Sequence, residues 1–185
     1  MKLYIRYMVS LRCKMTVKKE LKKLGLEYVF IDFGMVEIFE DITIEQLELL
    51  RVNLLKLRLE LLDHKTNILI EKIMGIIIEM INLSDKLPEL TYSDYISKKL
   101  HQDYTYLANL FSEVFGITIR QFIIINKIEK VKELLLYDKL NLTEIAFKLH
   151  YSSVSHWSHQ FKKITGLTPS FFKQLRKKRS NLENI

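Results

Sequence analysis

The stretch that decides the fold of the second half runs from residue 141 to residue 172 and reads NLTEIAFKLHYSSVSHWSHQFKKITGLTPSFF. Apolar residues recur at helical spacing on both sides of a short polar break, and a glycine follows the second run. The pattern predicts a short helix, a tight turn, a longer helix and a glycine stop. This is the outline of a helix-turn-helix.

The same outline occurs once before in the chain. The letters ISKKLH at residues 96–101 correspond to IAFKLH at residues 145–150, and GIT at residues 116–118 corresponds to GLT at residues 166–168. The offset is 49 residues before the first turn and 50 after it, so the second turn holds one extra residue. Two helix-turn-helix units in tandem indicate a DNA-binding function.

A long helix is predicted between the two units, at residues 119–137, because apolar residues lie nearly all round it at helical spacing. Nineteen residues span about 28 Å at roughly 1.5 Å per residue. A rod of this length would hold two reading helices about one DNA turn apart, or roughly 34 Å.

Charge is concentrated in the half that carries the repeat. The chain has 185 residues and a formal net charge of +7. Residues 1–88 hold 14 Lys or Arg and 13 Asp or Glu, whereas residues 89–185 hold 15 and 9. The excess of positive charge therefore lies where a nucleic-acid partner would need it. No nucleophile–base pair, phosphate-binding glycine loop or pair of carboxylates is visible, so we do not expect an enzyme.

A single cysteine, Cys13, excludes an intramolecular disulfide and a metal site built from four thiolates. The first residues show no secretory cleavage pattern. The most apolar stretch, residues 68–83, is interrupted by Glu71, Lys72 and Glu79 and is not expected to span a membrane. We therefore expect a cytoplasmic protein.

The first half alternates between strand and helix patterns. Residues 3–9 are rich in strand formers, and residues 14–24 have the spacing of an amphipathic helix that Gly25 ends. Two short strands surround Gly34, a second helix covers residues 43–55, and a further strand is predicted at residues 57–62. The order strand-helix-strand-strand-helix-strand is a split βαβ, or ferredoxin-like, arrangement. An effector-sensing or dimerisation domain would complement a DNA-binding half.

Residues 65–83 predict a long helix with apolar side chains on most of its circumference. It is either a core helix covered on two sides or a linker helix that pairs with its twin in a homodimer. Pro88 marks the next boundary. The predicted organisation is an N-terminal α+β domain (1–63), a linker or dimerisation helix (64–88) and an all-α domain (89–180) with the two helix-turn-helix units.

The segment VSLRCKMTV at residues 9–17 resembles the loop of heavy-metal-associated domains, where a Cys-x-x-Cys pair binds copper(I). Here Thr16 occupies the second cysteine position. The resemblance implies Cys13 and Met15 as soft-metal ligands, with Met8 and Met35 near them in the fold. The other interpretation is that these residues fill the core. A copper or silver sensor with DNA binding as its output is thus an alternative hypothesis, and otherwise no cofactor is expected.

Residues 92–179 resemble the C-terminal domain of the AraC/XylS family of bacterial transcription regulators. The signature is NLTEIA at residues 141–146 followed by FKKxxGxTPSxF at residues 161–172. The resemblance implies a sequence-specific regulator of transcription. Its two helix-turn-helix units would be joined by a helix, and each would place its second helix in one of two successive major grooves of double-stranded DNA.

Carried over position by position, the resemblance implies six base-facing residues: Thr105, Ala108, Asn109, Val154, Ser155 and His159. Positive residues near the end of the domain are candidates for phosphate contacts: Lys162, Lys163, Lys173, Arg176 and Lys177.

Three departures from the family pattern bear on this reading. Asn109 and His159 stand where relatives often carry Arg. Since Asn prefers adenine and His is a weaker reader, the preferred site is expected either to be rich in A·T pairs or to depend more on DNA shape and phosphate contacts. His150 and Tyr151 stand where the family usually has Gly-Phe, which predicts strain in the second turn. The operator, the effector and the direction of regulation are not encoded in any visible pattern.

Overall fold

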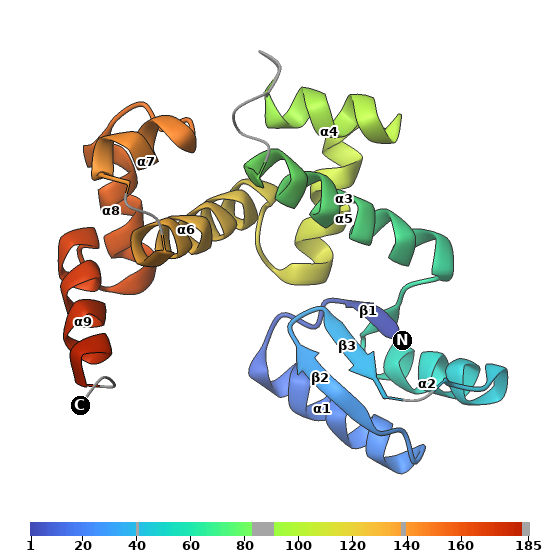
Figure 1. Cartoon of the computed structure of the whole chain (residues 1–185). Coiled ribbons are helices and arrows are strands. Elements are labelled where there is room, and N and C mark those ends of the chain that lie inside the picture. Colours follow the sequence, from blue (N-terminus) through green and yellow to red (C-terminus); the bar gives the residue numbers. More distant parts are fainter. Residues whose placement is uncertain (40, 83–90, 138–139, 183–185) are drawn as a thin grey trace. The chain divides into compact units, whose positions relative to one another are not determined.

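The computed structural model describes residues 1–39, 41–82, 91–137 and 140–182 (Figure 1). The chain packs as two compact units. The first comprises Met1–Gly75 together with Thr91–Ile119, and the second comprises the end of α3 (His64–Asn82) and the chain from Arg120 onward. The first unit thus joins segments from both sides of the expected boundaries at residues 63 and 88, and the three-part division stays a prediction. Pro88 lies outside the described residues.

The first unit begins with the element order that the sequence predicts. The elements are β1 (Lys2–Arg6), α1 (Leu11–Lys23), β2 (Tyr28–Asp32), β3 (Met35–Ile38), α2 (Ile44–Lys56) and β4 (Glu60–Leu61). The four strands form one sheet in the order β2-β3-β1-β4, and all neighbours are antiparallel. Assignment to the ferredoxin-like fold stays a prediction. The last strand is shorter than expected, because α2 continues to Lys56 and Arg58 has a left-handed backbone, with φ 60°.

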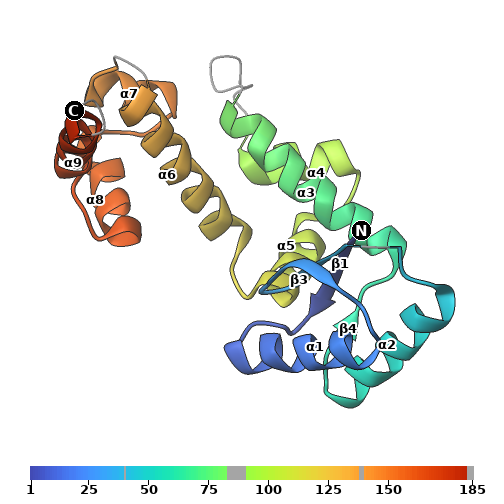
Figure 2. The same cartoon turned by 60° about the horizontal axis from the view of Figure 1, so that its bottom comes forward.

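The two faces of this sheet have different partners. Leu3 and Ile5 of β1 point to the same side and form one core with residues of α1 and α2, including Leu21 and Leu54. Tyr4 points to the other side, where it is fully buried and its ring meets the edge of Phe115 at a centroid distance of 6.1 Å. Figure 2 shows α1 and α2 on one side of the sheet and the start of α3 on the other.

Tyr4 makes the stability of this unit depend on pH. The pKa of the Tyr4 hydroxyl is raised from 10.0 to about 12, mainly because the group is buried. The nearby carboxylates of Glu71 and Glu37 raise this pKa further. Since the folded state holds the proton more tightly than the unfolded chain does, the stabilisation is complete below pH 10.0 and is lost as the pH rises through about 12.

We expect Tyr4→Phe to remove this dependence. Phenylalanine keeps the ring but cannot ionise, so the free energy of unfolding of the wild type should fall by about 2 kcal/mol more than that of the variant between roughly pH 9.5 and 12. Urea unfolding of both proteins across this range measures the difference. Parallel pH profiles would contradict the assignment.

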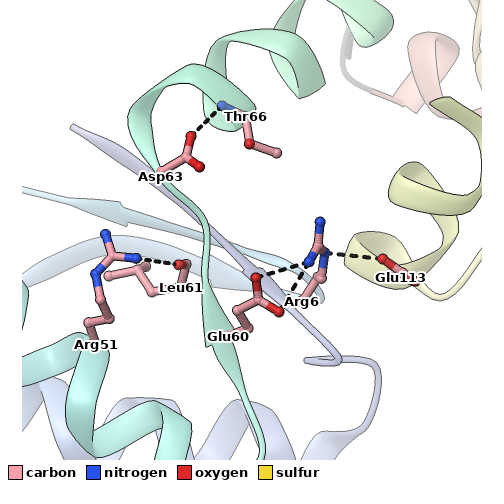
Figure 3. Close-up of polar contacts among 7 residues, drawn as sticks. All are labelled: Arg6, Arg51, Glu60, Leu61, Asp63, Thr66 and Glu113. Carbon is pink, nitrogen blue, oxygen red and sulfur yellow. Dashed lines mark hydrogen bonds and ion pairs between the residues drawn. The ribbon is translucent and has the colours of Figure 1, made fainter. Parts of the chain in front are cut away.

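Helix α3 starts at a side-chain cap and carries a buried apolar stripe. The carboxylate of Asp63 accepts a hydrogen bond of 2.8 Å from the backbone N–H of Thr66, and this bond is the main cause that lowers the pKa of Asp63 (Figure 3). The predicted stripe of the helix is buried within the single chain and consists of Ile70, Ile73, Ile77, Met80 and Ile81. This stripe is therefore covered within the chain.

The remaining elements are all helical. In chain order they are α4 (Tyr92–Leu100), α5 (Tyr104–Phe115), α6 (Ile119–Tyr137), α7 (Leu142–Lys148), α8 (Val154–Thr165) and α9 (Pro169–Leu182). The structure confirms the predicted helix at residues 119–137 at both ends. Among the described residues, no single helix is both long enough and apolar enough to cross a membrane.

Candidate DNA-binding interface

The first helix-turn-helix pair, α4 and α5, belongs to the first unit. Asp103 caps α5, because its carboxylate accepts a hydrogen bond of 3.0 Å from the backbone N–H of Tyr106. His101, in the turn before it, has a left-handed backbone with φ 52°. Gly116 ends α5 in the same left-handed region, with φ 69°. Leu107, Leu110, Phe111 and Val114 form the buried side of the helix, as predicted.

The second pair, α7 and α8, repeats this construction in the second unit. Asn141 and Glu144 form the capping box that the sequence predicts, and Ser153 is the N-cap of α8. His150 has a left-handed backbone with φ 52°. Because this conformation costs least for glycine, a histidine at this position carries a backbone cost. Gly166 ends α8.

Lys127 of α6 supports the end of α7. Its ammonium group donates a hydrogen bond of 2.8 Å to the backbone carbonyl of Leu149 and lies 4.9 Å from the centre of the Tyr151 ring. Burial lowers the pKa of Lys127. A second support is aromatic, since Trp157 and Phe161 are fully buried and their rings meet edge to face.

The predicted base-facing residues lie on the outer sides of α5 and α8. Thr105 and Asn109 are exposed on α5, and Ser155 and His159 are exposed on α8. Ala108 and Val154 are half-buried beside them. Each second helix therefore presents short polar side chains to solvent opposite its buried apolar side.

The candidates for phosphate contact are less uniform. Lys162 and Lys163, in the last turn of α8, are exposed, and Lys173 of α9 is half-buried. Arg176 and Lys177 belong to α9, but their side chains lie outside the described part of the structure.

Comparison with known proteins identifies the segment that holds both pairs. Residues 96–175 match the family model described as "Helix-turn-helix domain". A crystal structure of a transcriptional regulator with an AraC-type DNA-binding domain, from Chromobacterium violaceum, superimposes with a TM-score of 0.53 at 16% identity, covering 62% of this chain and 96% of that one. Residues 96–175 are a helix-turn-helix domain with the AraC-type fold.

Two further similarities involve this AraC-type domain. The DNA-binding domain of AdpA, a global transcriptional factor solved in complex with a target DNA, has a TM-score of 0.51 at 14% identity, covering 60% of this chain and 94% of that one. The uncharacterized HTH-type transcriptional regulator YtdP of Bacillus subtilis is 26% identical over 101 residues, which are 50% of this chain. The chain spans only 13% of the length of that relative.

One helix of the AraC-type domain, α5, packs against the N-terminal sheet, a contact that the sequence did not predict. The end of α5 packs against the sheet of the first unit, where the backbone N–H of Tyr7 donates a hydrogen bond of 2.8 Å to the carbonyl of Glu113. The guanidinium of Arg6 lies 3.1 Å from the carboxylate of Glu113 and 2.9 Å from that of Glu60 (Figure 3). One arginine thus pairs with two carboxylates, one from β4 and one from α5, and offsets part of their combined negative charge.

Two glycines allow this close approach. A Cβ atom on Gly34, in the turn between β2 and β3, would lie 2.2 Å from the backbone oxygen of Val114. A Cβ atom on Gly116 would lie 2.9 Å from the side chain of Val9. Both glycines have positive φ, which by itself disfavours a side chain. The close contact with a distant segment is a second reason why neither position can hold one. The sequence showed the turn function of these glycines and gave no sign of the contact.

A groove of about 350 Å³ opens where this segment meets α5. We call it the Tyr7 groove, and its walls are Tyr7, Val9, Asn109, Ser112, Glu113 and Gly116. One of the six predicted base-facing residues, Asn109, therefore shares a surface with the loop that follows β1.

The predicted soft-metal ligands are not brought together. Both lie within α1 and not in a loop, two positions apart, and residues at this spacing do not face each other on a helix. Cys13 packs partly against the core, where Met8 is fully buried, whereas Met15 is 50% exposed. No group of three or more His, Cys, Asp or Glu side chains in residues 1–39, 41–82, 91–137 and 140–182 could hold a metal ion. The soft-metal hypothesis stays a prediction.

Proposed function

We propose that this chain is a sequence-specific DNA-binding regulator of transcription. The observation that supports this most directly is the repeated geometry of α5 and α8, each capped at its start, ended by glycine and polar on its outer side. In the proposal these two helices read bases in successive major grooves. The DNA complex of the structurally similar AdpA domain supports double-stranded DNA as the partner.

The proposed base contacts are those of the exposed polar side chains. Asn109 would read adenine through its amide, and His159 would read from α8. Because neither is an arginine, the proposed site is rich in A·T pairs, and phosphate contacts carry much of the affinity. The exposure of Lys162 and Lys163 in the last turn of α8 supports this role, and Lys173, Arg176 and Lys177 are further proposed contacts.

A direct test is selection of binding sites from a random DNA library with the full chain. We expect a preferred sequence to be enriched and to compete at least 100-fold better than a scrambled version in band-shift assays. The usual ratio of specific to non-specific affinity is about 10³ to 10⁷, so this is a minimum. If six phosphates are neutralised, affinity should fall by roughly three decades between about 50 and 200 mM salt. Equal competition by both sequences would contradict the proposal.

The double variant Asn109→Ala with His159→Ala tests the reading residues. Each lost base contact is worth about 1–3 kcal/mol, so the variant should bind the selected site roughly 30-fold or more weakly and bind scrambled DNA unchanged. Gln102→Ala, at an exposed residue of the turn before α5, serves as the control. Undiminished binding by the double variant would contradict the assignment of these two residues.

We further propose that the sheet of the first unit is a ferredoxin-like domain for effector sensing or self-association. Self-association through β2 is supported by the exposure of its apolar residues, since Val29 is 63% and Phe30 46% exposed on the outermost strand. Unprotected edge strands readily pair with a second chain. The buried stripe of α3 gives no comparable support to pairing through residues 65–83. Sedimentation equilibrium of the full chain measures the mass that decides between monomer and homodimer.

A further inference from the structure

We infer that the loop after β1 is part of the DNA-reading surface of the first helix-turn-helix, and that the Tyr7 groove receives the methyl group of a thymine beside the base that Asn109 reads. This inference rests on the proposed function, because it assumes that α5 enters a major groove. It assigns a base-recognition site to residues of the N-terminal sheet, outside the AraC-type domain.

The loop is held against α5 by contacts on both of its sides. The Tyr7 backbone bonds to Glu113 of α5, and the carbonyl of Met8 accepts a hydrogen bond of 3.1 Å from the N–H of Gly34. Tyr7 itself has a left-handed backbone, with φ 65°, which is costly for a residue with a side chain. A strained residue persists only where its surroundings determine the conformation, so the loop presents Tyr7 and Val9 in one defined arrangement.

The chemistry of the Tyr7 groove fits a thymine methyl group. Its outer walls are the side chains of Tyr7 and Val9, which are 47% and 48% exposed although both are largely apolar. Apolar side chains in the major groove recognise thymine through its C5-methyl group. The amide of Asn109 on the adjoining wall is suited to the N6 and N7 atoms of adenine. The two walls together therefore match neighbouring A·T pairs.

The acidic side chain that lines the groove is paired with a cation. Glu113 also lines the groove, and an unpaired carboxylate there would repel phosphates. Arg6 lies 3.1 Å from that carboxylate and 2.9 Å from the carboxylate of Glu60, so it offsets part of the negative charge of Glu113. The end of β1 and the loop after it thus bring to α5 an apolar wall and a cation that offsets part of the charge of Glu113.

The test replaces thymine by uracil, which removes only the methyl group. Sites are first selected from random DNA with the full chain, and each thymine of the preferred site is then replaced singly. Affinity is measured by fluorescence anisotropy for the wild type, Val9→Ala and the control Val52→Ala. Val52 lies on α2 and is 46% exposed, so it matches Val9 in exposure and in the atoms removed.

We expect at least one uracil substitution next to the pair that Asn109→Ala affects to weaken wild-type binding roughly fourfold, the value of one buried methyl group at about 0.8 kcal/mol. This loss should persist in Val52→Ala and disappear in Val9→Ala. Methyl dependence that survives in Val9→Ala, its absence at every thymine, or tighter binding of all DNA by Val9→Ala would overturn the inference and leave the proposed function intact. Failure to enrich any sequence would instead overturn the proposed function and the inference with it.

Discussion

Gly34→Ala should destabilise the first unit by about 2–5 kcal/mol. The added methyl group would lie 2.2 Å from the carbonyl oxygen and 2.8 Å from the carbonyl carbon of Val114, and both atoms belong to the backbone of α5. Since neither atom can rotate away, α5 and the turn between β2 and β3 must separate. The substitution thus combines the cost of a left-handed alanine, about 1–2 kcal/mol, with overpacking of about 1–3 kcal/mol.

Gly25→Ala is the matched control for this experiment. Gly25 has nearly the same backbone, with φ 69° against 72° for Gly34, and a Cβ atom there would meet no atom within 4 Å. It therefore carries the backbone cost alone. Urea unfolding followed by circular dichroism measures both variants. Equal losses would show that the contact between Gly34 and α5 contributes nothing to stability.

The same pair of variants tests whether the contact between the sheet and α5 contributes to DNA affinity. If the sheet holds α5 in its reading orientation, Gly34→Ala should weaken binding to the selected site even under conditions where the variant is folded. Gly25→Ala should bind like the wild type. A folded Gly34→Ala protein with unchanged affinity would show that α5 reads DNA without the help of the sheet.

Trp157→Ala should cost the second unit about 3–5 kcal/mol, a large part of the 5–15 kcal/mol that typically stabilises a domain. The indole is fully buried and contacts Phe161, whose ring in turn meets Phe172 at 5.5 Å. Removal of the indole leaves a cavity beside Phe161 in α8, the helix that packs against both α7 and α9. We expect the amide NMR signals of these helices to lose dispersion while those of the sheet keep theirs.

Trp157→Phe provides the comparison. It keeps an aromatic ring against Phe161 and removes an indole N–H that has no hydrogen-bond partner among the described residues. Its cost should therefore be smaller than that of Trp157→Ala, because it leaves a smaller cavity. The affinity for the selected site should fall strongly in Trp157→Ala and little in Trp157→Phe. Loss of structure in both variants to the same extent would contradict this account of the core.

Local features of the AraC-type domain could be predicted because they depend on residues close in sequence. The caps at Asp103 and Asn141 act on backbone groups two or three residues away, and the stops at Gly116 and Gly166 belong to the last turn of their helices. The exposed positions of Asn109 and His159 follow from the helical period once the buried side is known.

Two predictions stayed open in the sequence because spacing does not show what surrounds a residue in the fold. The soft-metal ligands were inferred from a loop pattern, but Ser10 caps α1 and places Cys13 and Met15 inside the helix, on different sides. The stripe of α3 had two interpretations, and burial of Ile70 and Ile73 favours the core over an exposed dimer face. Neither result can be read from spacing alone, since one stripe looks the same whichever surface covers it.

The sequence by itself determined the two helix-turn-helix units, because capping, helical period and glycine stops are short-range and each leaves a trace in neighbouring residues. Only the tertiary structure decided which part of the chain the first helix-turn-helix packs against. The contacts join residues that are far apart in the sequence: Tyr4 with Phe115, Arg6 with Glu113, and Gly34 with Val114. Contacts of this kind require loop closure and complementary shape, which no local pattern encodes.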